Sequence, residues 1–421
     1  MTFKPVILLS ILPVMIAAQA GAADITIACG YQESEMRLCQ EAADAWSAES
    51  GNHVEVIRAP ERSDERYLYI LDLLARDDAS VDIFQIDVIW PSAMAGDLVD
   101  LTEHVPAEER AAFIRTIVDN NTVDGRLVAL PWFTDAGMLY YRKDLLDKHA
   151  LPVPETYGEL AETALAVQTA ERAGGQADLW GFVFEGQAYE GLTCNALEWI
   201  SAHGGRILDD DGNIVVDSPA SALALGGAAA WVDTIAPPKV TQFVEEDARI
   251  TFQLGNAVFM RNWPYAWSLL QAEDSAVKGK IGVAPLPKGG VHGQHSAVLG
   301  GWQLAVSRFS ENQEAAIDFV RYLTSRDEQK RRAIQGSFAP TIADLYQDPE
   351  VLDANPFFAD LGATLQDAVA RPSARTGVQY AQLSTLFWEA AHRTLTGYGT
   401  AADNLARLED RLKLLQDRAG W

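Results

Sequence analysis

The most informative stretch of this chain is almost continuously apolar and reads Val81-Asp82-Ile83-Phe84-Gln85-Ile86-Asp87-Val88-Ile89. A run of this kind is typical of a parallel strand that is buried on both faces. Before it, the pattern predicts a strand over 24–30, a helix over 33–50, a second strand over 53–58 and a helix ending near Ala75. This alternation of strands and helices predicts an α/β domain with a parallel sheet.

Asp87 lies near the end of the apolar stretch. In open α/β sheets, ligands bind beyond the carboxyl ends of the strands. A carboxylate within an apolar strand is costly unless it is paired or meets a ligand. Two interpretations of Asp87 therefore remain open, namely a ligand-binding acid and an acid that caps a neighbouring backbone.

The first 23 residues have the pattern of a signal peptide. The run Pro5 to Ile16 carries no charge, and Ala18-Gln19-Ala20 and Gly21-Ala22-Ala23 are both plausible cleavage sites. The run is shorter than the roughly 20 apolar residues that span a bilayer. A lipoprotein signal needs a cysteine directly after the run, and Cys29 comes too late. We therefore expect a periplasmic protein without a lipid anchor.

The length and charge of the chain exclude some classes of partner. Its 421 residues suffice for two domains at about 100–200 residues each. The net charge of −26 argues against nucleic acid as a partner, because phosphates require Lys and Arg. It argues less strongly against an anionic ligand, since a local basic pocket can override the total, and its main effect is on solubility.

The cysteines and the other possible ligands give no metal-binding pattern. Export permits a disulfide between Cys29 and Cys39, although two buried thiols are an equal alternative, and Cys194 is expected to be a buried free thiol. The acidic segment 209–213 lacks the spacing of an EF-hand loop and favours a hairpin turn. His292 and His295 have no third ligand in view, so we expect neither a metal nor a cofactor.

Three segments combine aromatic rings with polar residues: 132–135, 261–267 and 300–302. Sugar hydroxyls require fixed donors and acceptors, of which charged groups form the strongest hydrogen bonds, and the apolar faces of sugar rings require flat aromatic surfaces. The segments therefore suggest a carbohydrate site. Core packing is the alternative for each ring and is favoured for Trp267.

In its motifs the chain resembles the extracellular solute-binding proteins that include maltose-binding protein, and within them the trehalose/maltose-binding proteins of ABC importers. The resemblance covers nearly the whole chain after residue 23. The segments that carry it are Ile86–Trp90, Leu130–Asp144, Trp180–Val183, Tyr189–Leu192, Phe252–Trp267, Val283–Pro287, Gly300–Trp302 and Arg371–Pro372.

This resemblance implies an α/β fold with two lobes, of the class II type of periplasmic binding proteins. The ligand cleft lies between the lobes, and the hinge consists of three crossing segments. The domain bounds that we expect are 1–23 for the signal peptide, 24–131 and 297–342 for the first lobe, and 132–296 and 343–421 for the second.

The resemblance also implies which residues bind the ligand. Acceptors are expected from Glu33 and Asp87 in the first lobe and from Asp135 in a crossing segment, with Arg66 and Tyr380 as weaker matches. The second lobe and the hinge are expected to contribute Trp263, Tyr265, Gly301, Trp302 and Arg371.

The chain departs from the relatives at two places. Phe133 stands where they carry a tyrosine, which removes one possible contact with the sugar. The stretch 373–378 differs in length, so the rim of the cleft is expected to differ in shape.

The function implied is that of a monomeric, periplasmic substrate-binding component that delivers a sugar to the permease subunits of an ABC importer. The expected ligand is an α-linked disaccharide, with trehalose before maltose or sucrose. One alternative keeps the fold and binds a glycosylated osmolyte, a polyol or a sugar acid. A second alternative is a glycoside hydrolase with a carboxylate pair drawn from Glu33, Asp87 and Asp135, although the resemblance is to binding proteins and not to enzymes.

Overall fold

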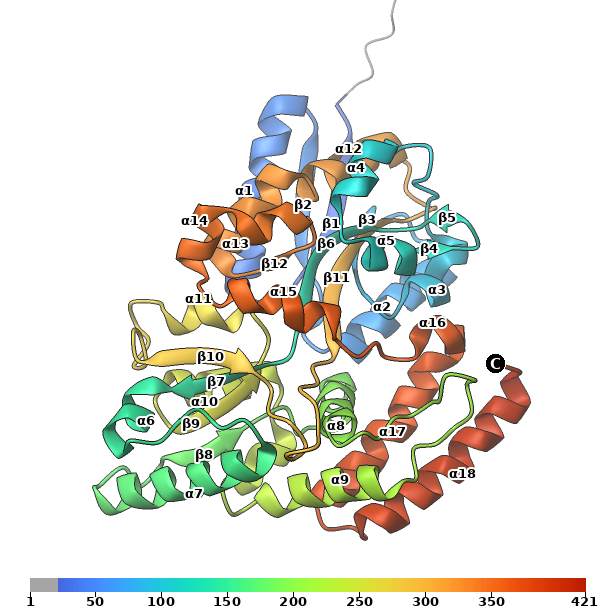
Figure 1. The fold of residues 1–421 in the computed structure, drawn as a ribbon. Helices are drawn as coiled ribbons and strands as arrows, with labels where there is room; N and C mark the ends of the chain where they lie inside the picture. The colour runs from blue at the N-terminus through green and yellow to red at the C-terminus, as the bar shows by residue number, and fades with distance from the viewer. Residues whose placement is uncertain (1–21) are drawn as a thin grey trace, which may run out of the picture.

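The computed structural model describes residues 22–421, which form two lobes drawn one above the other in Figure 1. The expected signal peptide, residues 1–23, lies outside the described residues except for Ala22 and Ala23, so its presence stays a prediction. From residue 22 onward, no helix is both long enough and apolar enough to cross a membrane.

A six-stranded sheet forms the centre of the first lobe, which is the upper one in Figure 1. β1 pairs in parallel with β2 and β3, whereas β11 is antiparallel to both β3 and β6. Every residue of β3 is buried, which confirms that the apolar stretch forms a buried strand. In spatial order the strands are β12 (Ala339–Pro340), β6 (Leu130–Ala136), β11 (Leu299–Val306), β3 (Ile83–Asp87), β1 (Asp24–Cys29) and β2 (His53–Arg58).

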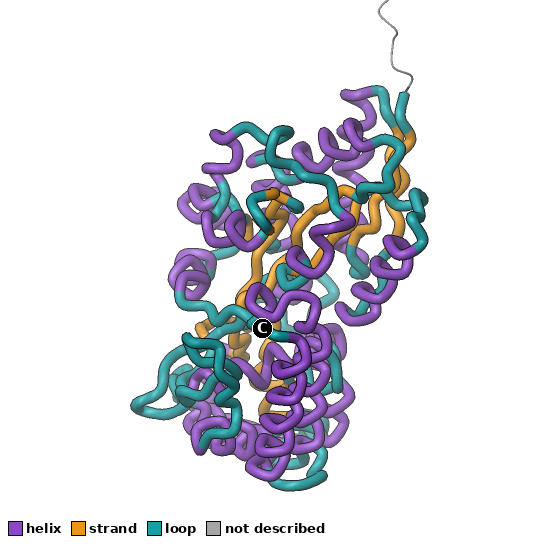
Figure 2. The backbone as a smooth tube through the Cα atoms, turned by 90° about the vertical axis from the view of Figure 1, so that its right-hand side faces the viewer, coloured by secondary structure: helices purple, strands orange, loops and turns teal. Residues whose placement is uncertain are grey.

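Helices lie on both sides of this sheet, as the turned view in Figure 2 shows. Trp46 packs on Phe319 with the ring centroids 4.9 Å apart, which joins the first helix of the lobe to a helix from much later in the chain. The remaining elements of the first lobe are α1 (Glu33–Ser50), α2 (Ser63–Ala75), α3 (Pro91–Met94), η1 (Ala95–Asp97), α4 (Ala107–Ala112), α5 (Arg115–Asn120), β4 (Thr122–Val123), β5 (Arg126–Leu127), α12 (Gln313–Leu323), α13 (Arg326–Gly336), η3 (Ala343–Gln347), α14 (Pro349–Ala354) and α15 (Phe358–Gln366).

The second lobe contains a four-stranded sheet of order β10 (Ile281–Pro285), β7 (Met138–Arg142), β9 (Ala257–Asn262) and β8 (Trp180–Val183). Its core centres on Trp231, whose ring meets Phe182 and Trp199 edge to face at 5.6 Å. The helices of this lobe are α6 (Lys143–His149), α7 (Tyr157–Ala173), α8 (Glu190–Ala202), α9 (Pro219–Trp231), η2 (Pro238–Gln242), α10 (Glu245–Gln253), α11 (Ala266–Leu270), α16 (Ser373–Thr376), η4 (Gly377–Gln379), α17 (Tyr380–Leu395) and α18 (Ala401–Ala419).

The chain crosses between the lobes three times: between β6 and β7, between β10 and β11, and after α15. Two of the boundaries differ from those expected at 132 and 343. β6 continues the first sheet to Ala136, and residues 343–366 stay with the first lobe, where α14 contacts α13 and α15 contacts β6. The physical reason is apolar burial, because Val351 and Phe358 are fully buried on that side.

Cys29 and Cys39 form a disulfide, so the alternative of two free thiols is wrong. The bond joins the end of β1 to α1 across a sequence separation of 10 residues. Cys194 is free and buried, as expected.

We predict that replacing Cys29 and Cys39 together by alanine lowers the free energy of unfolding by ~2–3 kcal/mol, because a closed loop of this size restricts the unfolded chain. Urea unfolding of the oxidised protein measures this. The reduced wild-type protein is the matched control and should unfold with the double variant. Equal stability of the oxidised and reduced wild-type proteins would contradict the prediction.

Candidate functional site

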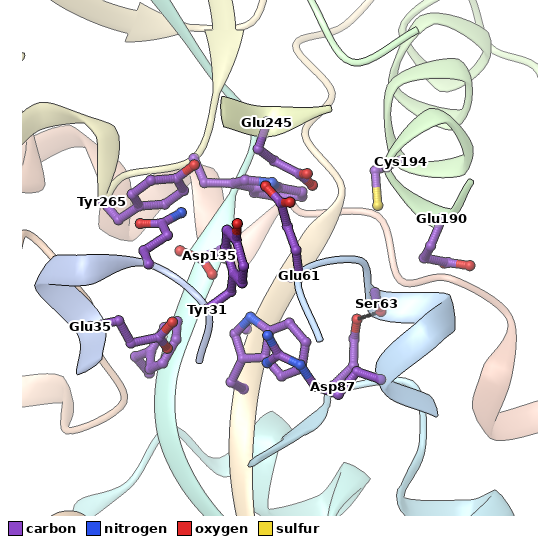
Figure 3. A pocket seen from close by; sticks show the side chains of 18 of the residues that line it. Tyr31, Glu35, Glu61, Ser63, Asp87, Asp135, Glu190, Cys194, Glu245 and Tyr265 are labelled. Atoms are coloured by element: carbon purple, nitrogen blue, oxygen red, sulfur yellow. Dashed lines mark hydrogen bonds between the residues drawn. The ribbon is translucent and has the colours of Figure 1, made fainter. Parts of the chain in front are cut away.

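A cavity lies between the lobes, at the carboxyl-terminal ends of β3 and β6 and the amino-terminal end of the antiparallel strand β11. Figure 3 shows side chains of both lobes converging on it. The residues that line it are Tyr31, Gln32, Glu35, Glu61, Ser63, Arg66, Asp87, Phe133, Asp135, Glu190, Gly191, Cys194, Glu245, Glu246, Trp263, Tyr265, Gly300, Gly301, Trp302, Phe338 and Arg371. This position agrees with the general rule for ligands of open α/β sheets.

Most of the residues expected from the sequence line this cavity. They are Arg66, Asp87, Asp135, Trp263, Tyr265, Gly301, Trp302 and Arg371.

Glu33 does not line the cavity, since its side chain is 99% exposed. Glu35 lines it instead, because residues two apart on α1 point to different faces of the helix. The glycine at position 30 makes room for Glu35: a Cβ atom there would lie 1.4 Å from Glu35 Oε2.

Tyr380 also lies outside the cavity, although its hydroxyl donates a hydrogen bond to Glu190 Oε1. Glu190 does line the cavity but was not predicted to do so. It lies in the segment Tyr189–Leu192, so the family resemblance could have identified it. Glu61, Glu245 and Glu246 were missed because they lie in a loop or at the start of a helix, where no periodic pattern distinguishes them.

Two glycines of β11 let the walls of the cavity approach closely. Gly301 has φ +125°, and a Cβ atom on it would lie 2.6 Å from the carbonyl oxygen of Phe133. A Cβ atom on Gly300 would lie 3.1 Å from the ring of Trp263. A side chain at either position would push β6 or the indole away from the cavity.

The two tryptophans of the cavity each stack on a buried arginine. The guanidinium of Arg261 lies 3.8 Å from the ring centroid of Trp263, and that of Arg66 lies 4.2 Å from the ring of Trp302. Trp90 also meets Trp302 edge to face at 5.7 Å. These contacts hold the indole planes in place.

Asp87 is already engaged in this arrangement. Its Oδ1 accepts from Arg371 Nη2 at 2.9 Å and from the backbone N–H of Ile89 at 3.3 Å, and its Oδ2 accepts from Ser63 at 3.0 Å. Arg371 Nη1 donates to Glu190 Oε1 at 2.8 Å. Asp87 therefore caps a backbone and also joins the first lobe to the second through Arg371.

Asp135 and Arg66 retain polar atoms that no described residue satisfies. Asp135 Oδ1 and Arg66 Nη1 are buried without a hydrogen-bond partner among residues 22–421. Burial raises the pKa of Asp135 well above its usual range and lowers that of Arg66. A bound molecule with hydroxyl groups could donate to the first and accept from the second.

Arg261, which stacks on Trp263, belongs to a buried ion-pair network. Arg261 donates to Glu198 through two nitrogens and to Glu185 Oε2 at 3.2 Å, and all three side chains are almost completely buried. Burial raises the pKa of Glu185 from 4.5 to about 7, against the lowering effect of Arg261.

No group of three or more His, Cys, Asp or Glu side chains within 22–421 is arranged to hold a metal ion. The acidic segment 209–213 forms a turn between the bridged residues Leu208 and Ile214, as expected.

We predict that Glu185 makes the protein less stable as the pH rises. Its pKa is higher in the folded chain than in the unfolded one, so its contribution is fully present below about pH 4.5 and is lost as the pH rises through about 7. The free energy of unfolding should therefore fall less between pH 5 and pH 8 in Glu185→Gln than in the wild type.

Urea unfolding at several pH values measures this, with Glu33→Gln, an exposed acid, as the control. A Glu185→Gln profile parallel to that of the wild type would contradict the assignment.

Known proteins provide a comparison for this geometry. Residues 32–330 match the model of the family described as bacterial extracellular solute-binding protein. A Deinococcus radiodurans protein named "Probable ABC transporter-binding protein" is 46% identical over 407 residues, 96% of each chain.

Among solved structures, maltose-bound MalE3 of T. maritima is 39% identical, with a TM-score of 0.89 over 94% of this chain and 100% of that chain. A solute-binding protein of Thermotoga lettingae bound to α-D-tagatose is 25% identical, with a TM-score of 0.83 over 93% and 98%. These similarities confirm the resemblance and the two-lobe fold expected from the sequence.

Proposed function

The chain belongs to the bacterial extracellular solute-binding protein family, and we propose that it is the sugar-binding component of an ABC importer. The family and these relatives are binding proteins and not enzymes, so the glycoside hydrolase alternative is wrong. As a periplasmic monomer, the protein would deliver its ligand to permease subunits in the inner membrane.

The observation that carries this proposal is that flat aromatic rings and unpaired polar atoms line one cavity. Trp263 and Trp302 offer indole surfaces, while Asp135 Oδ1 and Arg66 Nη1 are a buried acceptor and donor that no described residue satisfies. Sugars need both kinds of surface, because one side of a pyranose ring carries C–H groups and its edge carries hydroxyls. Charge-assisted hydrogen bonds to the hydroxyls are the strong ones.

Within this class we propose an α-linked glucose disaccharide as ligand. The T. maritima protein with a sequence identity of 39% is bound to maltose, and the sequence resemblance favours trehalose before maltose or sucrose. Phe133 at the wall of the cavity has no hydroxyl, which removes one contact with the sugar. The smaller alternative is a monosaccharide or polyol, since the Thermotoga lettingae protein is bound to tagatose.

We predict that trehalose or maltose raises the melting temperature, because a ligand at 100 times its dissociation constant stabilises the native state by about 2.7 kcal/mol.

Asp135→Ala and Trp263→Ala should each weaken binding. Hydrogen bonds to charged groups contribute about 1.5–3 kcal/mol, so the loss for Asp135→Ala is about ten- to hundredfold.

Isothermal titration calorimetry measures these affinities. Glu33→Gln is the matched control, because Glu33 is exposed outside the cavity, and it should bind as the wild type does. A melting curve that responds to neither trehalose, maltose nor sucrose would eliminate the disaccharide, and a shift with tagatose or mannitol alone would favour the smaller ligand.

The site requires both lobes, and we propose that the sugar drives their closure. Contacts across the cavity include Gln32 Nε2 to Glu246 Oε1 at 3.1 Å and the Arg371–Asp87 pair. A ligand shifts a conformational equilibrium only by binding one state better than the other. Moving it from mostly open to mostly closed takes about 5.5 kcal/mol, which two or three charge-assisted hydrogen bonds and a stacked ring can supply.

We predict a smaller radius of gyration with saturating sugar than without it, measured by small-angle X-ray scattering. Arg371→Ala should weaken both the affinity and the compaction, because it removes the pair that joins Asp87 to Glu190. Superimposable scattering curves of the free and saturated wild-type protein would exclude ligand-driven closure, even if the sugar bound.

A further inference from the structure

Two carboxylates of opposite lobes face one another across the cavity. Glu61 comes from the loop before α2 in the first lobe, and Glu245 begins α10 in the second. In Figure 3 their carboxylate groups point toward each other, and Asp135 lies in the same cavity.

These acids have no cationic partner in the part of the chain that the structure describes. None of the ion pairs within 4.0 Å there involves Glu35, Glu61, Asp135 or Glu245. Among residues 22–421, Glu61 accepts no side-chain hydrogen bond, and the carboxylate of Glu245 accepts one, from the hydroxyl of Tyr189 at 2.6 Å.

The arginines near this pair are bound to other acids. Arg62 is paired with Asp64 at 2.6 Å, and Arg249 with Glu246 at 2.6 Å. Arg66 has no acidic partner within 4.0 Å in the described part of the chain, but its guanidinium stacks on Trp302 and donates to the carbonyl of Pro60. Among residues 22–421, the guanidinium groups of Arg66 and Arg332 both lie near the cavity without an acidic partner within 4.0 Å, and that of Arg332 is fully buried against Phe133 and Phe338. Neither forms an ion pair with Glu61 or Glu245.

Bringing these carboxylates together is unfavourable unless something neutralises them. Burial raises the pKa of Glu61, and the charges of Glu245, Glu246, Asp247 and Glu65 raise it further. Like charges on approaching lobes oppose closure, and the opposition grows as water leaves the gap. A neutral sugar supplies hydroxyl donors to these acids but no positive charge.

Glu61 and Glu245 belong to no group of three or more His, Cys, Asp or Glu side chains within residues 22–421 that could hold a metal ion. A protonated amine does fit, since it carries a positive charge and three hydrogen-bond donors. Asp135, whose Oδ1 is buried without a partner among residues 22–421, lines the same cavity.

We propose that the preferred ligand is an amino sugar, with a sugar ring at Trp263 and a basic amine between Glu61 and Glu245. This inference rests on the proposed sugar-binding function and narrows its substrate class. The ammonium group would bridge the two lobes, so that the cation itself favours the closed arrangement.

The test compares trehalose, its 2-amino and 6-amino derivatives and the N-acetyl forms of both amines, by calorimetry at pH 7 and constant ionic strength. We expect at least one amine to bind tenfold or more tightly than trehalose and than its own N-acetyl form. The preference should fall toward one in the double variant Glu61→Gln/Glu245→Gln and persist in the control Glu33→Gln. The far-UV circular dichroism spectrum and cooperative thermal unfolding of the double variant show whether it is folded.

Amines that bind no better than trehalose would overturn the inference, as would a preference that survives in the double variant. If trehalose binds more tightly as the pH falls from 8 to 5.5 and the amines have no advantage, a proton neutralises the pair and the inference is again wrong. Binding of trehalose without amine preference leaves the proposed function intact. Absence of binding by every sugar and amine would overturn both.

Discussion

The buried guanidinium of Arg371 is the interaction on which the arrangement of the lobes depends. It lies on the last crossing segment and reaches Asp87 at the end of β3 and Glu190 at the start of α8, at 2.9 and 2.8 Å. One side chain thereby joins the central strand of one lobe, a helix of the other and the hinge. Removing one member of such a network leaves an uncompensated buried charge, which is far more costly than the net value of the pair. The wall of the cavity and the relative position of the lobes therefore depend on the same contacts.

The regular elements of the first lobe could be predicted from the sequence because burial imposes a period on them. The apolar run that contains β3 and the three- and four-residue spacing of α1 both appear in the structure as expected. The lobe boundaries could not be predicted in the same way. The sequences of α14 and α15 do not indicate which lobe buries their apolar residues, and only their contacts with α13 and β6 show it. Trp267 illustrates the point, because it packs on Phe357 of the other lobe. It does not line the cavity, which agrees with the expectation that it is a packing residue.

The site was predictable to the extent that family resemblance or secondary structure pointed to a residue. Asp87, Trp263 and Trp302 lie in such segments and do line the cavity. The family resemblance implied Glu33 in place of Glu35, although the helix expected over 33–50 agrees with α1. A match that is two residues out of register points to the wrong face of the helix. Glu61 and Glu245 become neighbours only when the two lobes meet, and no local pattern in the chain records that meeting.

The disulfide between Cys29 and Cys39 has a consequence for when the protein can bind. Tyr31, Gln32 and Glu35, which form one wall of the cavity, all lie within the loop that the bond closes. With the bond formed, this wall is already ordered before the ligand binds. The free energy of binding therefore contains no cost of ordering it. In a reducing compartment residues 30–38 lose that restraint, and we expect the affinity to fall by the free energy of ordering them. Formation of the disulfide therefore favours ligand binding, and it can take place only after the chain has left a thiol-rich compartment.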